Sequence, residues 1–325
     1  MRSKHICDIH KMQHALFDHL RSLIPGKLLP EVAASLDISY DAAHRRVTGK
    51  TQLTYAEAQQ LASYFGISLD GLRAQTQEVL VRRPSPVRDE DSLLHYLQQS
   101  KDLLSAFAVA RTDKRWLTYS AKDIPLVNLL SQPRLARFKT FVWFNLLEPD
   151  TWEERDLSSL NWFPELDRAI SELRSTIADY NVREIWNDTT ITSTLTQVRY
   201  YLQAGRISNR QAMGVLTDLK QVVNSVKQQL ASSVRYQLYH NELLILNNNV
   251  LVTAGADRLL LVPYWVLGFW STQDHETTQQ MAQYFTDQLD QSLLLNTSGA
   301  RERNSFFNRM LRRIDATQAM IEQEL

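Results

Sequence analysis

Apolar residues recur every three or four positions through the first 72 residues, which predicts a series of short amphipathic helices. Ser39 stands before the third helical segment as an N-cap, and Thr54 with Glu57 three residues later has the pattern of a capping box. The segments expected to be helical cover residues 11–24, 28–37, 40–48 and 54–66, followed by a short turn or helix at 67–72. This spacing predicts a compact N-terminal domain of five helices.

The pattern along the rest of the chain predicts longer helices and then a change of period. A buried stretch at 116–148 is rich in apolar and aromatic residues, and its prolines are expected to separate short helices. Between residues 234 and 272 the period is that of strands, with Asn and Gly at the expected turns 247–249 and 255–257. The longer helices are expected at 90–112, 164–186, 191–204, 208–231, 274–292 and 300–323. The predicted fold class is therefore mainly α, with a helix-rich α+β C-terminal domain that contains a small antiparallel sheet.

A change of composition at residues 81–90 predicts the domain boundary. This segment, VRRPSPVRDE, combines two prolines and a serine with alternating charges, which is typical of a linker. We expect an N-terminal domain at 1–80 and a dimerisation or sensor domain at 91–325.

Composition and charge narrow the classes of function. The 325 residues are 44% hydrophobic and 22% charged, with a net charge of zero, so any affinity for nucleic acid must come from a local surface. One cysteine, Cys7, excludes a disulfide framework within the chain and fits a reducing compartment. The first residues lack a signal-peptide core, and no apolar run approaches the roughly 20 residues that span a bilayer. We therefore expect a cytoplasmic protein without a membrane partner.

Residues 28–50 have the three features that a DNA-reading helix-turn-helix needs. A first helix holds the second at a fixed angle, the second has an apolar inner face, and polar side chains lie near its N-terminal end. Ala33 permits close approach of the two helices, Ile38 in the turn can enter the core, and Ala43 and Val47 face inward. The residues expected to face outward and read base edges are Tyr40, Asp41, His44 and Arg45.

Each of these side chains suits a particular contact with DNA. Arg45 can bind guanine O6 and N7 with two hydrogen bonds, and His44 can donate to a base or a phosphate. Tyr40 can touch a thymine methyl or a phosphate, and Asp41 can accept from a cytosine amine or orient an arginine. Residues at loop and helix-end positions are expected to contact the DNA backbone, which positions the protein without reading sequence; they are Ser39, Arg46, Lys50, Thr51 and Gln52.

The local charge is modest. Residues 1–83 hold 11 Lys and Arg against 8 Asp and Glu, a difference of +3. Because one such domain would bind DNA weakly, a homodimer on two half-sites is expected, with double-stranded DNA as the partner.

Residues 11–72 resemble the lambda-repressor-like helix-turn-helix domain. The string ISYDAAHRRVTGKTQLTYAEAQQLASYFGISLD is similar to the N-terminal domain of a family of transcription regulators from Bacteroidetes. The similarity continues at WLTYSAKDIPLVNLL, LARFKTFVWFNLL and RERNSFFNRML, so it covers most of the chain. The resemblance implies a DNA-binding regulator and brings neither a known ligand nor catalytic residues.

Clusters that could support metal binding or catalysis have simpler explanations. Cys7, His10 and His14 offer three local ligands, but no CxxC partner follows, so we expect a polar helix and no metal or cofactor. His240 with Glu242, and likewise His275 with Glu276, could form acid–base pairs. Neither pair accompanies a nucleophile motif or a phosphate-binding loop, and turn polarity explains both. We therefore predict that the chain is not an enzyme.

Two further features in the second domain leave alternatives open. The dense aromatic residues between 143 and 270 are expected mainly in the core. The alternatives are a ligand pocket between sheet and helices and an exposed aromatic surface for dimerisation. The residues that would line such a pocket, for an unknown small-molecule effector, are Trp265, Phe269 and Trp270. A basic helical stretch is expected as a solvated face, with anion or DNA contact as the alternative; it contains Arg301, Arg303, Arg309, Arg312 and Arg313.

The sequence thus predicts a sequence-specific DNA-binding transcription regulator with a C-terminal effector or dimerisation domain. One alternative is a protein-interaction module in which the N-terminal helices dock a partner. A further alternative is an enzyme whose active site lies in the aromatic region.

Overall fold

The computed structural model describes residues 2–24, 26–67, 69, 79–107, 115–243 and 247–323. The chain forms two compact units, Met1–Leu80 and Val81–Leu325. Within the described residues, no helix is both long and apolar enough to cross a membrane.

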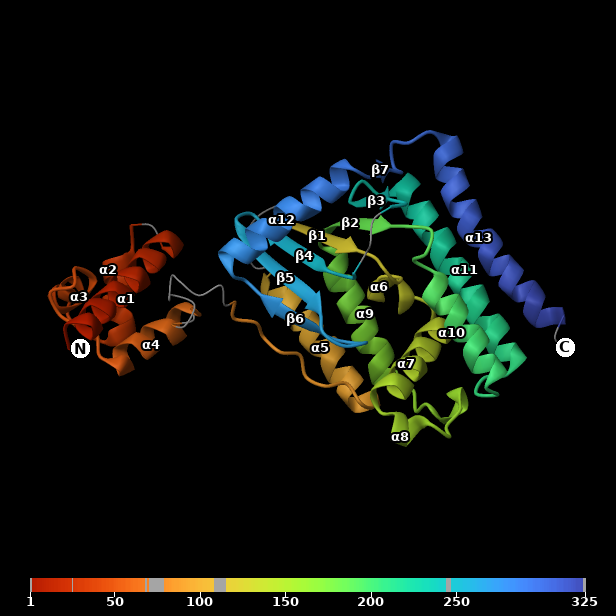
Figure 1. Cartoon of the computed structure of the whole chain (residues 1–325), viewed down its shortest axis with the longest axis horizontal. Coiled ribbons are helices and arrows are strands. Elements are labelled where there is room, and N and C mark those ends of the chain that lie inside the picture. Colours follow the sequence, from red (N-terminus) through yellow and green to blue (C-terminus); the bar gives the residue numbers. More distant parts are fainter. Residues whose placement is uncertain are drawn as a thin grey trace. The chain divides into compact units, whose positions relative to one another are not determined.

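Four helices form the described part of the N-terminal unit (Figure 1). Ser39 accepts a hydrogen bond from the Ala42 amide, and Thr54 and Glu57 form the reciprocal capping box, so the sequence prediction of both caps is confirmed. Apolar residues from all four helices share one core, which includes Leu16, Val32 and Leu61. The expected fifth helix at 67–72 falls largely outside the described residues. The helices are α1 (Arg2–Leu23), α2 (Leu28–Leu36), α3 (Tyr40–Val47) and α4 (Tyr55–Phe65).

The second unit is built on a mixed sheet, so the prediction of a mainly α fold with a small antiparallel sheet is wrong. Among the described residues, seven strands form one sheet in the order β6-β5-β4-β1-β2-β3-β7. Strands β1, β2 and β3 are parallel, and the other neighbouring pairs are antiparallel. The strands are β1 (Arg115–Ser120), β2 (Asn181–Trp186), β3 (Tyr236–His240), β4 (Val250–Ala254), β5 (Asp257–Pro263), β6 (Phe269–Thr272) and β7 (Leu293–Leu294).

The prediction failed at two short strands that follow or precede helices. Strand β1 lies in the stretch expected to hold only short helices, and β2 lies at the end of a segment predicted as one helix, 164–186. That helix in fact ends at Ala178, and a two-residue turn separates it from β2. Strands of six residues with side chains packed on both faces carry no clear alternation, so their period does not separate them from the neighbouring helices.

Helices cover both faces of the sheet (Figure 1). One face carries α12, whose Phe285 packs with Ile185, Leu251 and Leu260 of the strands. The opposite face belongs to the main core and is covered by α5 and α9, which pack together, and by α11, which packs against α7 and α13. The helical segments are α5 (Glu90–Phe107), α6 (Leu126–Leu129), α7 (Pro133–Leu147), α8 (Pro149–Trp152), the 3-10 helix η2 (Leu157–Ser159), α9 (Pro164–Ala178), α10 (Thr192–Gln203), α11 (Asn209–Ser232), α12 (His275–Asp290) and α13 (Ala300–Gln323).

The segment 81–89, within the predicted linker, packs on the second unit. Arg82 exchanges two backbone hydrogen bonds with Ser271 of β6, at N···O distances of 2.8 and 3.1 Å. Val87 is buried in the main core. We call residues Arg82–Ser85 the strap, because they lie along the edge strand β6 before α5 begins.

Candidate functional site

The polar face of α3 is exposed in the N-terminal unit. Tyr40, Asp41, His44 and Arg45 are all exposed, and the Tyr40 side chain has 56% of its surface accessible. On the same helix Ala43 and Val47 are buried. The four residues predicted to read bases therefore lie on a solvent-facing side of a helix whose other side is fixed in the core.

The residues predicted to contact the DNA backbone differ in exposure and in the contacts that they make. Arg46 forms an ion pair with Glu57 of α4 (Nη2 to Oε1, 2.6 Å) and also donates to the Ala42 carbonyl. This pairing lowers the pKa of the Glu57 carboxyl. Ser39 serves as the N-cap of α3, whereas Lys50 and Gln52 are exposed and Thr51 is half-buried. Arg46 thus fastens α3 to α4.

One buried glutamine that the sequence analysis did not single out positions the end of α3. The Gln13 side chain donates to the carbonyls of Arg46 (2.8 Å) and Thr51 (2.9 Å) and accepts from the Leu53 amide (3.0 Å). Because these bonds reach the last turn of α3 and the loop that follows it, Gln13 ties both to α1. A lone polar position inside the apolar stripe of the first helix was the only signal in the sequence.

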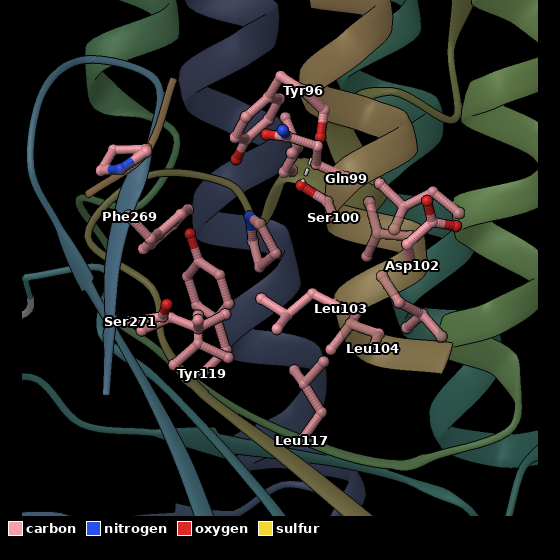
Figure 2. A pocket seen from close by; sticks show the side chains of 18 of the residues that line it. Tyr96, Gln99, Ser100, Asp102, Leu103, Leu104, Leu117, Tyr119, Phe269 and Ser271 are labelled. Carbon is pink, nitrogen blue, oxygen red and sulfur yellow. Dashed lines mark hydrogen bonds between the residues drawn. The ribbon is translucent and has the colours of Figure 1, made fainter. Parts of the chain in front are cut away.

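The second unit contains a cavity of about 510 Å³ between the sheet and the helices. The pairing of the strands places the sheet residues of the cavity side by side. Tyr119 of β1 pairs with Glu184 of β2 on one side and with Val250 of β4 on the other. Val250 in turn pairs with Leu261 of β5. Side chains at paired positions point to the same face of a sheet. The opposite wall comes mainly from α5, and Figure 2 shows Leu103 and Leu104 facing Tyr119 and Leu117.

The three aromatic residues predicted to line a ligand pocket lie in different surroundings. Phe269 lines the cavity, whereas Trp265 lines a smaller neighbouring cavity of about 90 Å³ that also touches Phe269 and Tyr119. Trp270 lines neither of these cavities and stacks on Tyr264, at 4.7 Å between ring centroids. Trp270 pairs with Val262, which places it on the other face of the sheet from Phe269.

The cavity has one buried carboxyl group, that of Glu184 in β2, which is 2% exposed. Its oxygens accept hydrogen bonds from the Tyr236 hydroxyl (2.7 Å), the Trp186 indole (2.9 Å) and the Asn128 amide (3.1 and 3.2 Å). Burial raises the pKa of Glu184 to about 7, against the opposing effect of these donors. The carboxyl group is therefore poised to gain or lose a proton near neutrality.

Two tyrosines add buried hydroxyl groups to the cavity. Burial raises the pKa of Tyr96 to about 12, and it raises the pKa of Tyr119 further, so both hydroxyls are neutral at physiological pH. Glu184, Tyr96 and Tyr119 were not among the residues predicted to line a pocket. The available signal was the single acidic residue in the otherwise apolar end of NVREIW, which is unusual for a buried strand.

The strap forms part of the cavity wall. All four of its residues, Arg82–Ser85, line the cavity. The Arg83 guanidinium lies over the rings of Tyr264 and Trp265, at 5.9 and 5.6 Å from their centroids. Gly268 has φ +133°, and a Cβ there would lie 3.3 Å from the Pro84 ring. The strap thus fits closely against the β5–β6 turn.

The predicted His240–Glu242 pair lies in an ion-pair cluster at the ends of β2 and β3. His240 Nε2 is buried, 3.3 Å from Asp188 and 4.0 Å from Glu242, and makes no well-formed hydrogen bond. One ligand atom from each of the three residues lies within 4.8 Å of the others. Arg309 of α13, however, pairs with Asp188 at 2.6 Å and lies 3.5 Å from Glu242. The single guanidinium of Arg309 offsets the charge of one of the two carboxylates, and its ion pairs fasten α13 to the sheet.

The remaining candidates stay apart from the cavity. His275 and Glu276 are exposed in the first turn of α12. In the basic stretch of α13, Arg309 binds Asp188, and Arg313 donates to the Asp188 carbonyl and to Thr192. The side chains of Cys7 and His10 lie outside the described residues.

Comparisons with family models, with curated proteins and with solved structures found no match to this chain. Functional inference therefore depends on the exposed face of α3 and on the cavity.

Proposed function

We propose that the chain is a DNA-binding transcription regulator that responds to a small molecule bound in its second unit. The exposed polar residues of α3 supply the DNA-reading surface, and the cavity supplies the effector site. Because DNA and its regulators share a compartment, we place the protein in the cytoplasm.

The DNA-reading part is supported by the geometry of α2 and α3. The two helices are joined by three residues, with Asp37 in the left-handed conformation at φ 52° and Ile38 packed against the core. This arrangement holds α3 with its polar side outward, as a helix that enters the major groove requires. Arg45 is the side chain best suited to guanine, and Lys50 and Gln52 remain candidates for phosphate contacts.

A second copy of the chain would complete the DNA-binding surface. One α3 covers only a few base pairs, and the excess charge of residues 1–83 is +3. Two copies on an inverted repeat would double both the base contacts and the phosphate contacts.

The cavity has the size and lining of a small-molecule site. Its volume of about 510 Å³ lies within the roughly 300–1,000 Å³ typical of ligand pockets. Its wall is mostly apolar, and its few polar groups include the Glu184 carboxyl and the Tyr96 and Tyr119 hydroxyls. Such a lining binds an apolar body and fixes its orientation through a small number of polar contacts.

The observation that carries the proposal is that the strap lines the cavity. Residues Arg82–Ser85 touch the cavity and continue through Val81 directly into the N-terminal unit. A ligand that contacts the strap favours one arrangement of the strap only if it binds that arrangement more tightly than the others. Through the covalent connection, that arrangement changes the freedom and spacing of the two DNA-reading units in a dimer.

The DNA-reading part is tested by selection of bound sequences from random DNA with the full-length protein. We expect an enriched inverted repeat for the wild type and no enrichment for Arg45→Ala. Arg174→Ala is a matched control, because it removes the same charge from an exposed position of α9 in the other unit. Equal enrichment by Arg45→Ala and the wild type would refute base reading by α3.

A further inference from the structure

We propose that the cavity binds an amphipathic organic amine, whose ammonium group pairs with Glu184 and whose apolar body lies between the sheet and α5. This inference rests on the proposed role of the cavity as an effector site, and it names the chemical class of the effector.

Neutral groups surround the Glu184 carboxyl. Its hydrogen-bond partners are a phenol, an indole and a carboxamide, all of them neutral donors. Within the described part of the chain, no Lys, Arg or His nitrogen forms an ion pair with this carboxyl. A buried carboxylate without a cation is costly, and a bound ammonium group would supply the missing charge.

The hydrogen-bond donors are shared unequally between the two oxygens of the Glu184 carboxyl. Oε2 accepts from Tyr236, Trp186 and Asn128, whereas Oε1 accepts from Asn128 alone. A carboxylate oxygen has two lone pairs, so Oε1 retains capacity for another donor. An ammonium group carries three donors and no acceptor, which matches this need.

The rest of the cavity wall is mostly apolar. Apolar side chains from three directions surround the cavity, including Leu117 and Val250 of the sheet, Leu103 of α5 and Ile177 of α9. The basic residues of the wall, Arg82 and Arg83, belong to the strap, and Arg83 lies over aromatic rings. A ligand with a hydrophobic body and one cationic end therefore fits the cavity better than an anion, which Glu184 would repel.

The tyrosines that face Glu184 and its cavity stay neutral between pH 6 and pH 8. Tyr236 of β3, Tyr119 of β1 and Tyr96 of α5 all have raised pKa values because they are buried. Asp102 of α5 and the strap residues Arg82 and Arg83 are the other charged groups that line the cavity. The neighbouring residues of α9 and of the segment 125–127 are apolar. Glu184, with a pKa of about 7, is thus the group that titrates.

The test uses three probes that each carry a phenyl group on a four-carbon chain: 4-phenylbutylamine, 4-phenylbutanol and 4-phenylbutyrate. Their affinities for the full-length protein are measured at pH 8 by isothermal titration calorimetry. We expect the amine to bind roughly 10- to 100-fold more tightly than the alcohol, as for one charge-assisted contact. We expect the butyrate to bind most weakly.

Two variants assign this preference to Glu184. In Glu184→Gln the preference for the amine should disappear while the alcohol binds within about twofold of the wild type, since the side chain keeps its size and one acceptor oxygen but loses the charge. Asp102→Asn is the matched control, because it neutralises an exposed carboxyl of the same cavity and should keep the preference. In the wild type, amine affinity should also rise between pH 6 and pH 8 while alcohol affinity stays constant, which needs no variant.

Four outcomes would overturn the inference. If the amine and the alcohol bind the wild type equally, the amine class is wrong while the effector site stands. A preference that persists in Glu184→Gln, or an amine affinity that does not vary with pH, would remove Glu184 from the recognition. If none of the three probes binds at millimolar concentration, both the inference and the effector role of the cavity fail, and DNA reading by α3 is left to its own test.

Discussion

The ionisation of Glu184 leads to a quantitative prediction about stability. Burial raises the pKa of this carboxyl from its ordinary value of 4.5 to about 7 in the folded chain. In the unfolded chain the group loses its proton at the lower value. Between the two values the folded state holds a proton that the unfolded state has released, so stability falls as the pH rises through this window.

The size of the effect follows from the two pKa values. Each unit of difference corresponds to about 1.4 kcal/mol, so the full loss in unfolding free energy is about 3 kcal/mol. About 2 kcal/mol of this loss falls between pH 5 and pH 8, where the protein can be studied conveniently. Glu184 is fully buried, so no reduction for solvent screening applies.

Tryptophan fluorescence during urea unfolding isolates the unit that contains Glu184. All the tryptophans of the chain lie in the second unit, at positions 116, 143, 152, 162, 186, 265 and 270. The difference in stability between pH 5 and pH 8 is measured for the wild type and for Glu184→Gln. Burial lowers the pKa of His240, which works in the opposite direction, and the comparison with the variant subtracts that contribution.

We expect the wild type to lose about 2 kcal/mol more than Glu184→Gln when the pH is raised from 5 to 8. Equal pH dependence in the two proteins would show that Glu184 has an ordinary pKa in the folded state. A larger loss of stability in Glu184→Gln than in the wild type would mean that folding lowers the pKa of Glu184, and it would refute the claim that burial raises this pKa.

Three other substitutions test separate parts of the structure. Arg46→Met should weaken the N-terminal unit by about 1–3 kcal/mol, because Glu57 loses its charged partner, and hydrogen exchange of the α3 and α4 amides would measure this loss; unchanged exchange would refute the role of the pair. Arg82→Pro removes the 2.8 Å backbone hydrogen bond from the strap to β6, whereas Arg82→Ala keeps it. Exchange in the segment 81–89 should therefore be several-fold faster in the proline variant than in the alanine variant, and equal rates would contradict the bridge. Arg309→Gln should raise the pKa of His240, because the nearby guanidinium adds to the lowering of this pKa by burial. A pH titration of the imidazole NMR signals measures the pKa, and a lower value in the variant would contradict this expectation.

The N-terminal unit was largely predictable because its signals are local. The caps at Ser39 and Thr54 and the inward positions Ala43 and Val47 each depend on residues within one helical turn. The role of Arg46 was not predictable in this way. Its partner Glu57 is 11 residues away on the next helix, and only the packing of α3 against α4 brings the two charges together.

The second unit was predicted less well because its order is set by distant pairings. Nothing within β1 indicates that Tyr119 lies beside Glu184, 65 positions later, and beside Val250 on the other side. The cavity forms only when these registers and the strap come together. Phe269 was named as a possible lining residue from aromatic density alone, and the same signal named Trp270, which lines neither of the two cavities.

The central claim, that α3 reads bases, is tested most directly by the ratio of two affinities. Fluorescence anisotropy would give the Kd of the wild type and of Arg45→Ala for the selected DNA site and for a scrambled site of equal length. All four measurements use the same salt concentration. We predict that Arg45→Ala weakens binding to the selected site roughly 10- to 100-fold and changes binding to the scrambled site little, because a bidentate base contact is lost. An equal loss on both sites would reduce Arg45 to a phosphate contact, and no loss on either would contradict base reading by Arg45.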